Sequence, residues 1–365
     1  MKIQIWAPGM DGSEGGIQAY SWEVYQALQK ILGKDNVRAI SIGGSPDSGV
    51  MEFSKYPNRL RNPLFALSCI VRAILEKPDY LLLTHVNLCP VAKLVQKFCA
   101  IPYGVSMHSL ELWQLHDDSK RNALLHANQV FPVSKWTRDA VLEQFPALKG
   151  RCTIVPNTFD AEKFPLGPKS SELLRRYNLP SDAKIILTVA RLSAEERYKG
   201  IDEIIHALPE VTAQVENCYY LIVGRGNDLQ RLKKCAELAG VKDRAIFCGY
   251  VPAEELSAHY QLCDVYAMPS RGEGFGITYL EALASGKPTL AGKLDASREA
   301  LLEGKLGVLV NSGRPDEIAK GLISLLNKTH PNQQLFNPQW LREEVIRAYG
   351  RAEFALNLQN ALNIK

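Results

Sequence analysis

The chain has 365 residues, of which 46% are apolar and 22% are charged, a composition typical of a soluble globular protein with roughly two domains. The formal net charge is only +4, and basic residues are not interleaved with aromatic residues, so the sequence does not support nucleic-acid binding. The longest apolar run, residues 64–75, is interrupted by Arg72 and is shorter than the roughly 18 residues that a helix needs to cross a bilayer.

The eight cysteines include no C-x-x-C pair and lie mostly in apolar segments, which is typical of reduced thiols in a cytoplasmic protein. Residues 1–16 do not have the layout of a signal peptide. There is no D-x-D motif and no metal-binding histidine pair, so we expect neither a metal ion nor a bound cofactor. These features predict a cytoplasmic protein.

The first half of the chain alternates strands with helices. Strands are predicted at residues 2–7, 37–42, 79–84, 103–107, 130–133 and 152–155. Helices are predicted at residues 17–32, 62–76, 88–98, 119–127 and 135–144. This alternation predicts a parallel sheet with helices on both faces.

Residues 156–168 contain three prolines and are predicted to link two domains. The alternation then resumes, with strands predicted at residues 184–190, 219–223, 245–248, 265–268, 288–291 and 307–310. We therefore expect an α/β protein with a Rossmann-like domain at 1–165 and a second at 166–337. The helical segment 338–365 is expected to pack back on the first domain.

The most informative stretch is residues 268–288, which reads as a strand end, a glycine-rich loop and a helix of about ten residues. A helix N-terminus behind such a loop presents unpaired N–H groups to an anion, here around Gly274, Phe275 and Gly276. Glu273 precedes the helix and Glu281 lies about two turns inside it. Carboxylates beside a phosphate site suggest a ligand that also offers hydroxyls, which points to a nucleotide sugar. The alternative is a Rossmann-like turn whose glutamates are solvated surface charges.

Two cations follow the first strand of the second half. Arg191 stands at the predicted end of this strand and Lys199 at the start of the next helix, so both are expected at the ligand-binding edge of the sheet. Fixed cations there can hold a diphosphate and stabilise it as it leaves. The alternative is a surface ion network with Glu195 and Glu196.

Two later turns of the second half are also predicted to approach the ligand. Gly224 ends one strand and opens a helix, which permits close approach of the backbone. Tyr250 and Val251 follow the next strand, where they could face a base.

In the first half, Gly15 and Gly16 precede a helix but do not form a G-x-G-x-x-G motif, so dinucleotide binding is poorly supported. His108 follows a predicted strand, with Glu111 three residues later. A lone histidine is more often structural, but a position at the carboxyl edge of a sheet favours a role in the site.

These motifs together resemble glycosyltransferase family 4, whose members are retaining enzymes with the GT-B fold. The resemblance covers nearly the whole chain, and the glutamate pair in Glu273-Gly-Phe-Gly-Ile-Thr-Tyr-Leu-Glu281 is its most specific part. It implies two Rossmann-like domains whose parallel sheets face each other across a cleft. It also implies that Glu273 lies by the donor sugar, Glu281 holds the ribose, and His108 faces the reacting sugar.

The resemblance further implies that Arg191 and Lys199 grip the diphosphate and that Gly15 and Gly16 line the cleft. Two departures from the family pattern matter. The arginine and the lysine are eight residues apart instead of about five, so Arg197 is an alternative to Lys199. The loop Gly292-Lys-Leu-Asp-Ala-Ser-Arg-Glu299 resembles the last donor loop of the family only loosely.

The expected reaction is metal-independent transfer of a sugar, with retention, from a nucleotide-sugar donor to an acceptor hydroxyl. The family implies a glycan or glycolipid acceptor in bacterial polysaccharide or glycolipid biosynthesis. Three alternatives stay open: a nucleotide-sugar epimerase or hydrolase, a non-catalytic nucleotide-sugar-binding subunit, and a nicotinamide dehydrogenase, which would need the missing glycine motif.

Basic residues precede the apolar segment at 62–76, namely Lys55, Arg59 and Arg61. A basic flank beside apolar residues can indicate weak peripheral contact with a membrane. Because the predicted helix is apolar on most of its circumference, burial against the sheet is the preferred expectation.

Overall fold

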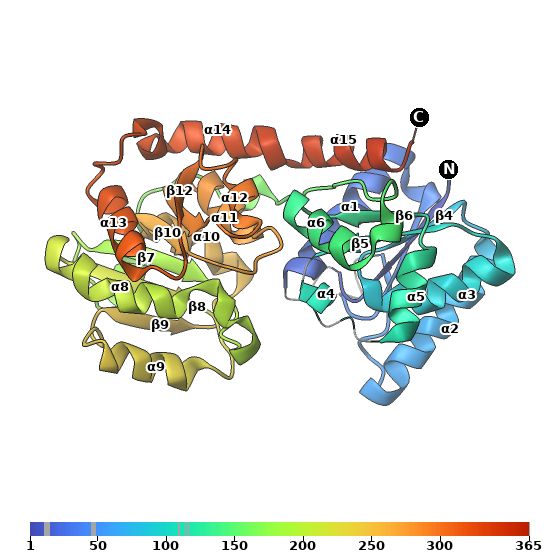
Figure 1. Ribbon diagram of the computed structural model, residues 1–365, viewed down its shortest axis with the longest axis horizontal. Coiled ribbons are helices and arrows are strands. Elements are labelled where there is room, and N and C mark those ends of the chain that lie inside the picture. Colours follow the sequence, from blue (N-terminus) through green and yellow to red (C-terminus); the bar gives the residue numbers. More distant parts are fainter. Residues whose placement is uncertain (11–14, 45–48, 109, 114, 116, 365) are drawn as a thin grey trace. The chain divides into compact units, whose positions relative to one another are not determined.

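The computed structural model describes residues 1–10, 15–44, 49–108, 110–113, 115 and 117–364. The chain forms two compact units, Met1–Phe159 together with Arg351–Lys365, and Asp160–Gly350. Each unit is built around its own six-stranded parallel sheet (Figure 1).

The sheet of the first unit has the strand order β3-β2-β1-β4-β5-β6. Its strands are β1 (Ile3–Ala7), β2 (Val37–Ser41), β3 (Met51–Glu52), β4 (Tyr80–Leu83), β5 (Tyr103–Met107) and β6 (Gln129–Pro132). Its helices are α1 (Gly16–Leu32), α2 (Asn58–Glu76), α3 (Cys89–Cys99), α4 (Leu110–Trp113), α5 (Asp118–His126), α6 (Lys135–Gln144) and α15 (Arg351–Ala361). The chain leaves β1 for β2 on one side and continues with β4 on the other, so the strand order reverses between β1 and β4.

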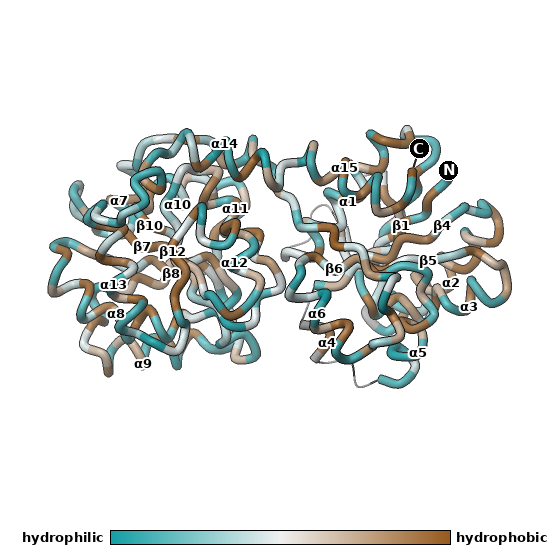
Figure 2. Tube along the Cα trace, turned by 45° about the horizontal axis from the view of Figure 1, so that its top comes forward, coloured by the Kyte–Doolittle hydropathy of each residue, from teal (hydrophilic) through white to brown (hydrophobic). Residues whose placement is uncertain are grey.

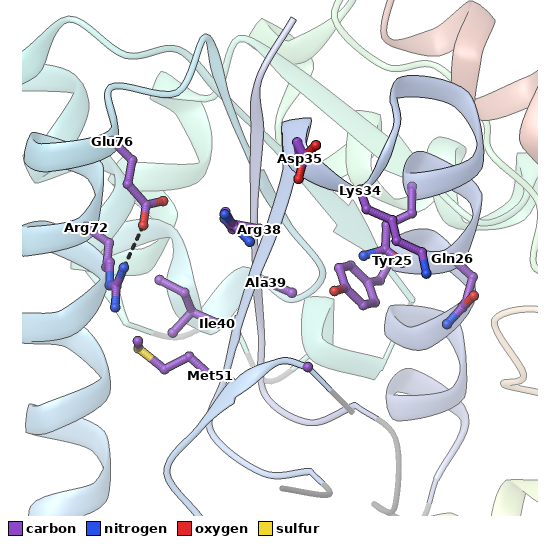
Figure 3. A pocket seen from close by; sticks show the side chains of 12 residues that line it. Tyr25, Gln26, Lys34, Asp35, Arg38, Ala39, Ile40, Met51, Arg72 and Glu76 are labelled. Carbon is purple, nitrogen blue, oxygen red and sulfur yellow. Dashed lines mark hydrogen bonds and ion pairs between the residues drawn. The ribbon is translucent and has the colours of Figure 1, made fainter. Parts of the chain in front are cut away.

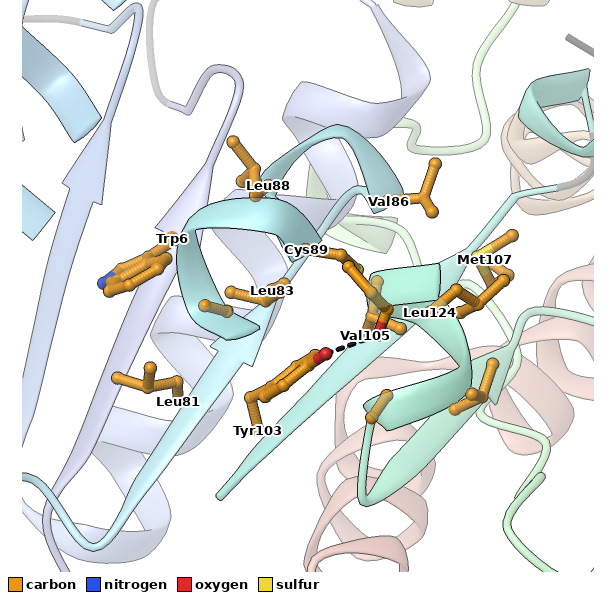
Figure 4. Packing of buried hydrophobic residues seen from close by; sticks show 14 of the residues in the cluster. Trp6, Leu81, Leu83, Val86, Leu88, Cys89, Tyr103, Val105, Met107 and Leu124 are labelled. Carbon is orange, nitrogen blue, oxygen red and sulfur yellow. Dashed lines mark hydrogen bonds between the residues drawn. The ribbon is translucent and has the colours of Figure 1, made fainter. Parts of the chain in front are cut away.

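One part of the core of the first unit lies between the sheet and the helices α2, α3 and α5 (Figure 4). Strands buried on both faces require continuous apolar runs, and all five residues of β1 and of β5 are buried. Tyr103 places its ring in this core and satisfies its hydroxyl by donating to the carbonyl of Ala123. The hydroxyl of Tyr103 is thus paired while its ring fills the apolar interior.

The sheet of the second unit has the order β12-β11-β10-β7-β8-β9. Its strands are β7 (Lys184–Val189), β8 (Cys218–Val223), β9 (Ala245–Gly249), β10 (Val265–Met268), β11 (Thr289–Gly292) and β12 (Gly307–Val310). Its helices are α7 (Ser171–Arg176), α8 (Ile201–Gln214), α9 (Leu229–Leu238), α10 (Ala253–Leu262), α11 (Ile277–Ala284), α12 (Ser297–Ala300), α13 (Pro315–Leu326) and α14 (Pro338–Tyr349).

Both units therefore have doubly wound topology, and the prediction of two Rossmann-like domains is confirmed. In Figure 2, which is coloured by hydropathy, the strands are largely brown because they are apolar, and many of the connections are teal because they are polar. In the second unit the strand order reverses between β10 and β7, which pair in parallel at Val265 and Ile186. In such sheets the carboxyl ends of the strands at the reversal form the binding crevice.

The predicted strand at 152–155 is wrong. The segment makes only an isolated bridge between Cys152 and Val130, although Val155 also donates from its backbone N–H to the carbonyl of Pro132 at 3.0 Å. Pro156 follows at once and cannot donate a ladder hydrogen bond. The short elements β3 and α4 were not predicted, because two to four residues are too few to show periodicity.

The helical segment 338–365 was expected to pack on the first domain, but it forms two helices that pack on different units. Helix α14 packs against α11 in the second unit, and only α15 packs against α1 in the first. Gly350 separates them with an extended backbone, and a Cβ there would lie 2.4 Å from the carbonyl oxygen of Ile346. Arg342 fixes α14 by donating to the carbonyls of Ala161 and Ala284 at 2.9 and 2.7 Å.

The expectation that helix α2 is buried against the sheet also has to be corrected. The helix buries Phe65, Cys69 and Ala73 against the core, as expected, but the opposite side of the helix stays exposed although it is also apolar. The expectation of burial therefore holds for one side of α2 only. Within the described residues no helix is both long and apolar enough to cross a membrane.

Candidate active site

Arg191 and Lys199 meet around one carboxylate at the carboxyl edge of the second sheet. Arg191 follows β7, and Lys199 ends the 3₁₀ segment Ala194–Lys199 that leads into α8. Both pair with the buried Glu196: Arg191 contacts Oε1, and the Lys199 ammonium lies 3.2 Å from Oε2. The Arg191 side chain is 73% exposed, so it remains accessible to a ligand. Of the two glutamates in the alternative surface ion network, Glu196 pairs with both cations but is buried, whereas Glu195 accepts from the Ser193 hydroxyl.

Glu273 belongs to the same cluster. Its Oε2 lies 3.8 Å from the Lys199 ammonium, beyond hydrogen-bond range, and has no hydrogen-bond partner among the described residues. Burial raises the pKa of Glu273 above its usual value, and the Lys199 charge opposes that rise. A half-buried carboxylate with an unused oxygen beside a cation can accept a hydrogen bond from a ligand hydroxyl.

Asp295 holds the loop that carries Glu273. Its Oδ2 accepts the backbone N–H of Glu273 at 2.6 Å, and its Oδ1 accepts the N–H of Ser297 at 3.0 Å. The side chain is fully buried between the two loops that follow β10 and β11. The loosely matching stretch Gly292–Glu299 thus contributes a residue that positions Glu273.

Arg197 points to a different partner. It makes a bidentate contact with Asp228, at 3.1 Å from Nε and 2.8 Å from Nη2, and Asp228 also binds Arg231. The side chain of Arg197 is therefore engaged away from Glu196 and Glu273. Of the two candidates for the second cation, the structure brings Lys199 to the carboxylate cluster.

Glu281 sits on α11 in a separate environment. Its Oε2 accepts the Tyr260 hydroxyl of α10 at 2.6 Å. Burial raises the pKa of Glu281 from its ordinary value of 4.5 to about 7, and the Tyr260 hydrogen bond and Lys163 oppose the rise. Bidentate binding of a ribose diol requires the carboxylate form, which accepts at both oxygens.

The loop between β10 and α11 places backbone, not side chains, in front of the helix. Gly276 caps α11 with a φ of 90°, a conformation that favours glycine. Gly274 is buried beside it, and the Phe275 ring packs edge-on against Tyr349 at 5.1 Å, within the core of the unit. Any contact of Phe275 with a ligand would thus be through its backbone.

The turns that follow β8 and β9 differ in what they expose: the first is closely packed at Gly224, and the second leaves Tyr250 half-exposed. A Cβ on Gly224 would lie 1.8 Å from the carbonyl oxygen of Ala190, so this glycine is required by the close approach of β7 and β8. Tyr250 is half-exposed after β9, with the Arg225 guanidinium 4.6 Å from its ring centre. Val251 follows it in a partly buried position.

His108 lies in the first unit, directly after β5. Its Nε2 is 3.0 Å from the carbonyl oxygen of Thr84, and its ring meets Tyr20 edge-on at 4.8 Å. Its backbone N–H donates to the buried Glu111 carboxylate, which explains the spacing seen in the sequence. Burial lowers the pKa of His108 to about 4. Because a carbonyl can only accept, the neutral ring must carry its proton on Nε2, which leaves the Nδ1 lone pair as an acceptor.

Gly15 and Gly16 lie at the start of α1, where Gly15 has a φ of 124° and its carbonyl accepts from Ala19. Both glycines are exposed. Sequence reasoning did not identify Asp295, Tyr260 or Thr84 as supporting residues. Each acts across 21 or more residues of chain, so no local motif could reveal it.

A cavity of about 620 Å³ lies elsewhere, between α1, β2 and α2 (Figure 3). It is lined by polar side chains that include Lys34, Arg38 and Arg72, and none of the predicted site residues, all of which are described, contributes to it. No three His, Cys, Asp or Glu side chains are grouped to hold a metal ion in the described part of the chain.

The second unit is similar in sequence to a known protein family. Residues 170–337 match the family model described as Glycosyl transferases group 1. The chain is 35% identical over 208 residues to a GDP-mannose-dependent α-(1-6)-phosphatidylinositol monomannoside mannosyltransferase of Mycolicibacterium smegmatis, covering 55% of this chain and 53% of the relative. It is 36% identical over 196 residues to a D-inositol 3-phosphate glycosyltransferase of Corynebacterium urealyticum, covering 51% and 46%. The chain thus spans about half the length of these curated relatives.

Solved structures match the whole chain. HepE of Anabaena in complex with UDP superposes with a TM-score of 0.79 at 17% identity, covering all of both chains. Sucrose-phosphate synthase of Thermosynechococcus elongatus gives 0.76 at 18% identity, covering 100% of this chain and 98% of the other. The predicted GT-B fold is confirmed by these similarities, and the second unit is similar in sequence to glycosyltransferases.

The environment of Glu281 predicts a stability change with pH. A carboxyl whose pKa is raised in the folded protein stabilises the fold in its protonated form. That contribution is complete below about pH 4.5 and is lost as pH rises through about 7. Glu281→Gln keeps the Tyr260 contact but cannot ionise. The free energy of unfolding of the variant relative to wild type should therefore increase by about 2–3 kcal/mol between pH 5 and pH 8.

This difference is measured by urea unfolding of both proteins across the pH range, following the transition of the second unit. Glu254→Gln, a change in the first turn of α10, serves as the control for removal of a glutamate from the same unit. A Glu281→Gln difference that does not vary with pH would mean that Glu281 is already ionised in the folded protein.

Proposed function

We propose that this protein is a retaining glycosyltransferase that moves a sugar from a nucleotide-sugar donor to an acceptor hydroxyl. The observation that carries the proposal is the cluster of Arg191, Lys199 and Glu273 at the strand-order reversal of the second sheet. This cluster falls inside the segment that matches the glycosyltransferase family model.

The donor diphosphate binds between the two cations and the N-terminus of α11. Arg191 and Lys199 now share Glu196, and a diphosphate with more negative charge would compete for them. The backbone N–H groups around Gly274, Phe275 and Gly276 add the positive end of the helix dipole. Glu281 holds the ribose diol, and the turn at Gly224, Tyr250 and Val251 lies beside the base.

The chemical step is attack of the acceptor on the same face as the leaving group. The bond between the anomeric carbon and the diphosphate oxygen breaks while the bond to the acceptor oxygen forms. The acceptor proton passes to the departing diphosphate oxygen, so the enzyme needs no covalent intermediate. Arg191 and Lys199 stabilise the charge that grows on the diphosphate, and Glu273 accepts a hydrogen bond from a sugar hydroxyl.

The acceptor is proposed to be a glycan or a glycolipid, bound by the first unit, where Gly15 and Gly16 allow close approach of the backbone. The name of the M. smegmatis relative refers to a phosphatidylinositol monomannoside, which is a glycolipid, and this supports the proposed class of acceptor. The proposed reaction requires no metal ion, because the two cations perform the role that a D-x-D-bound metal would have.

The proposal is tested by a panel of nucleotide sugars. GDP-mannose is included because of the M. smegmatis relative, and UDP-glucose because HepE binds it. A true donor should raise the unfolding temperature by mass action and should be consumed only when an acceptor is added, with undiminished rates in EDTA. Donor consumption without acceptor would favour the hydrolase or epimerase, and binding without any turnover would favour the non-catalytic subunit.

The choice between Lys199 and Arg197 gives a sharper prediction. Lys199→Ala should lower the turnover number about 100-fold or more and donor affinity much less, because the leaving-group charge is largest in the transition state. Arg197→Ala is the matched variant, and it should leave turnover within about threefold of wild type once folding is verified. If Arg197→Ala is the more damaging change in transfer assays, the assignment of Lys199 is wrong.

The tautomer of His108 predicts how it acts. Its Nδ1 lone pair should accept a hydrogen bond from a donor-sugar hydroxyl, so His108→Ala should bind donor nearly normally and transfer sugar about 10–100-fold more slowly. Because its pKa is near 4, the transfer rate should show no titration of His108 between pH 5 and pH 8.

The control is His126→Ala, a histidine on α5 that contacts the carbonyl of Asn122. Donor affinity is measured by calorimetry and transfer by product formation. Wild-type transfer rates in His108→Ala would remove this residue from the site, whereas a loss of donor affinity equal to the loss of rate would assign it to ground-state binding.

A further inference from the structure

Helix α2 has an exposed apolar face that the core of the first unit does not use. Its inward residues Phe65, Cys69 and Ala73 repeat at intervals of four and are buried. The large apolar residues exposed on the same helix are Leu60, Leu67, Val71, Ile74 and Leu75. Leu75 is 73% exposed, as much as many charged residues at a protein surface. A helix that serves only the core has one apolar stripe and a polar opposite side.

The neighbouring helix extends this surface. Helix α3 packs against α2, and the two lie side by side in Figure 1. Leu94 and Phe98 are four residues apart on α3, hence on one side of it, and both are exposed, Phe98 by 77%. We call these seven residues on α2 and α3 the α2–α3 apolar face. Several large apolar side chains exposed on two adjacent helices indicate a binding surface more often than singly scattered ones do.

The charge around this face indicates its partner. Residues 51–100 contain seven Lys or Arg and three Asp or Glu, and the rest of the chain contains 36 of each, so the entire net charge of +4 falls in this segment. Several cations stand next to the exposed apolar residues in the sequence: Arg59 and Arg61 flank Leu60, and Lys97 precedes Phe98. Lys97 lies 5.5 Å from the centre of the Phe98 ring.

We propose that the α2–α3 apolar face docks on an anionic lipid surface. The apolar side chains would enter the boundary between headgroups and acyl chains, and the long basic side chains would reach back to the anionic headgroups. The association is peripheral, since it uses one side of α2 and one side of α3. The inference rests on exposure and charge alone and does not depend on the proposed transferase activity.

A second copy of the chain is a less suitable occupant. Two copies that met through this face in a symmetric dimer would bring the same cations together, because an isologous interface pairs a patch with itself. Like charges placed opposite each other weaken such an interface. An anionic lipid surface instead pairs both the apolar and the basic residues of the face.

The test is co-sedimentation of the full chain with vesicles. The protein should bind vesicles that contain phosphatidylglycerol and should bind pure phosphatidylcholine vesicles much less. Binding should fall as the salt concentration rises to about 0.5 M, where screening shortens the reach of surface charges to a few ångströms. The triple variant Leu67→Gln, Ile74→Gln, Leu75→Gln should bind at least about tenfold more weakly, since it removes apolar contact area.

Two further variants make the result specific. Arg59→Glu with Lys97→Glu should reduce binding to anionic vesicles while keeping the apolar residues. A matched triple variant, Leu238→Gln, Ile346→Gln, Leu356→Gln, removes exposed apolar residues elsewhere and should bind like wild type. All variants change exposed side chains, so unchanged thermal unfolding verifies that each is folded.

Three results would overturn the proposal. One is no sedimentation of wild type with anionic vesicles. Another is equal binding by the α2 triple variant and the matched control. The third is concentration-dependent dimerisation in analytical ultracentrifugation that the α2 triple variant abolishes, which would assign the face to self-association.

Discussion

The candidate site depends on one constraint, the placement of a buried carboxylate, Glu196, and a half-buried carboxylate, Glu273, beside a single lysine. Glu196 and Glu273 each have a buried oxygen without a hydrogen-bond partner among the described residues, and the Lys199 ammonium lies near both. Buried charges persist only when opposite charge compensates them. The cluster is therefore held ready for a ligand that supplies both hydroxyl donors for the carboxylates and negative charge for the cations. A nucleotide sugar has both.

The candidate site residues of the two units differ in charge. In the second unit the cations and carboxylates form an electrostatic site, and Asp295 fixes the backbone of the loop that carries Glu273. In the first unit burial keeps His108 neutral, and the Thr84 carbonyl, although it opposes this lowering of the pKa, holds the proton on Nε2 and leaves the lone pair on Nδ1. The second unit thus presents charged groups, and the first presents an uncharged hydrogen-bond acceptor.

Helix α2 shows that an apolar sequence can serve two purposes. Its inner side completes the core with Phe65, Cys69 and Ala73, and its outer side leaves Leu67, Ile74 and Leu75 exposed. A helix that is apolar all round looks buried when only its composition is considered. Tertiary packing decides otherwise, because α2 lies at the surface and has the sheet and α3 as neighbours on its inner side.

The sequence by itself determined the doubly wound architecture and most of the charged site, because strand runs, glycine turns and strand-end cations are local patterns. Arg191, Lys199, Glu273 and Glu281 could be named for this reason. Only the tertiary structure decided that Lys199 and not Arg197 meets Glu273, since Asp228, 31 residues away, binds Arg197. It also decided the Asp295 contact, the tautomer of His108 and the break at Gly350. Each of these depends on groups distant in the chain, and no local spacing of residues encodes where distant groups meet.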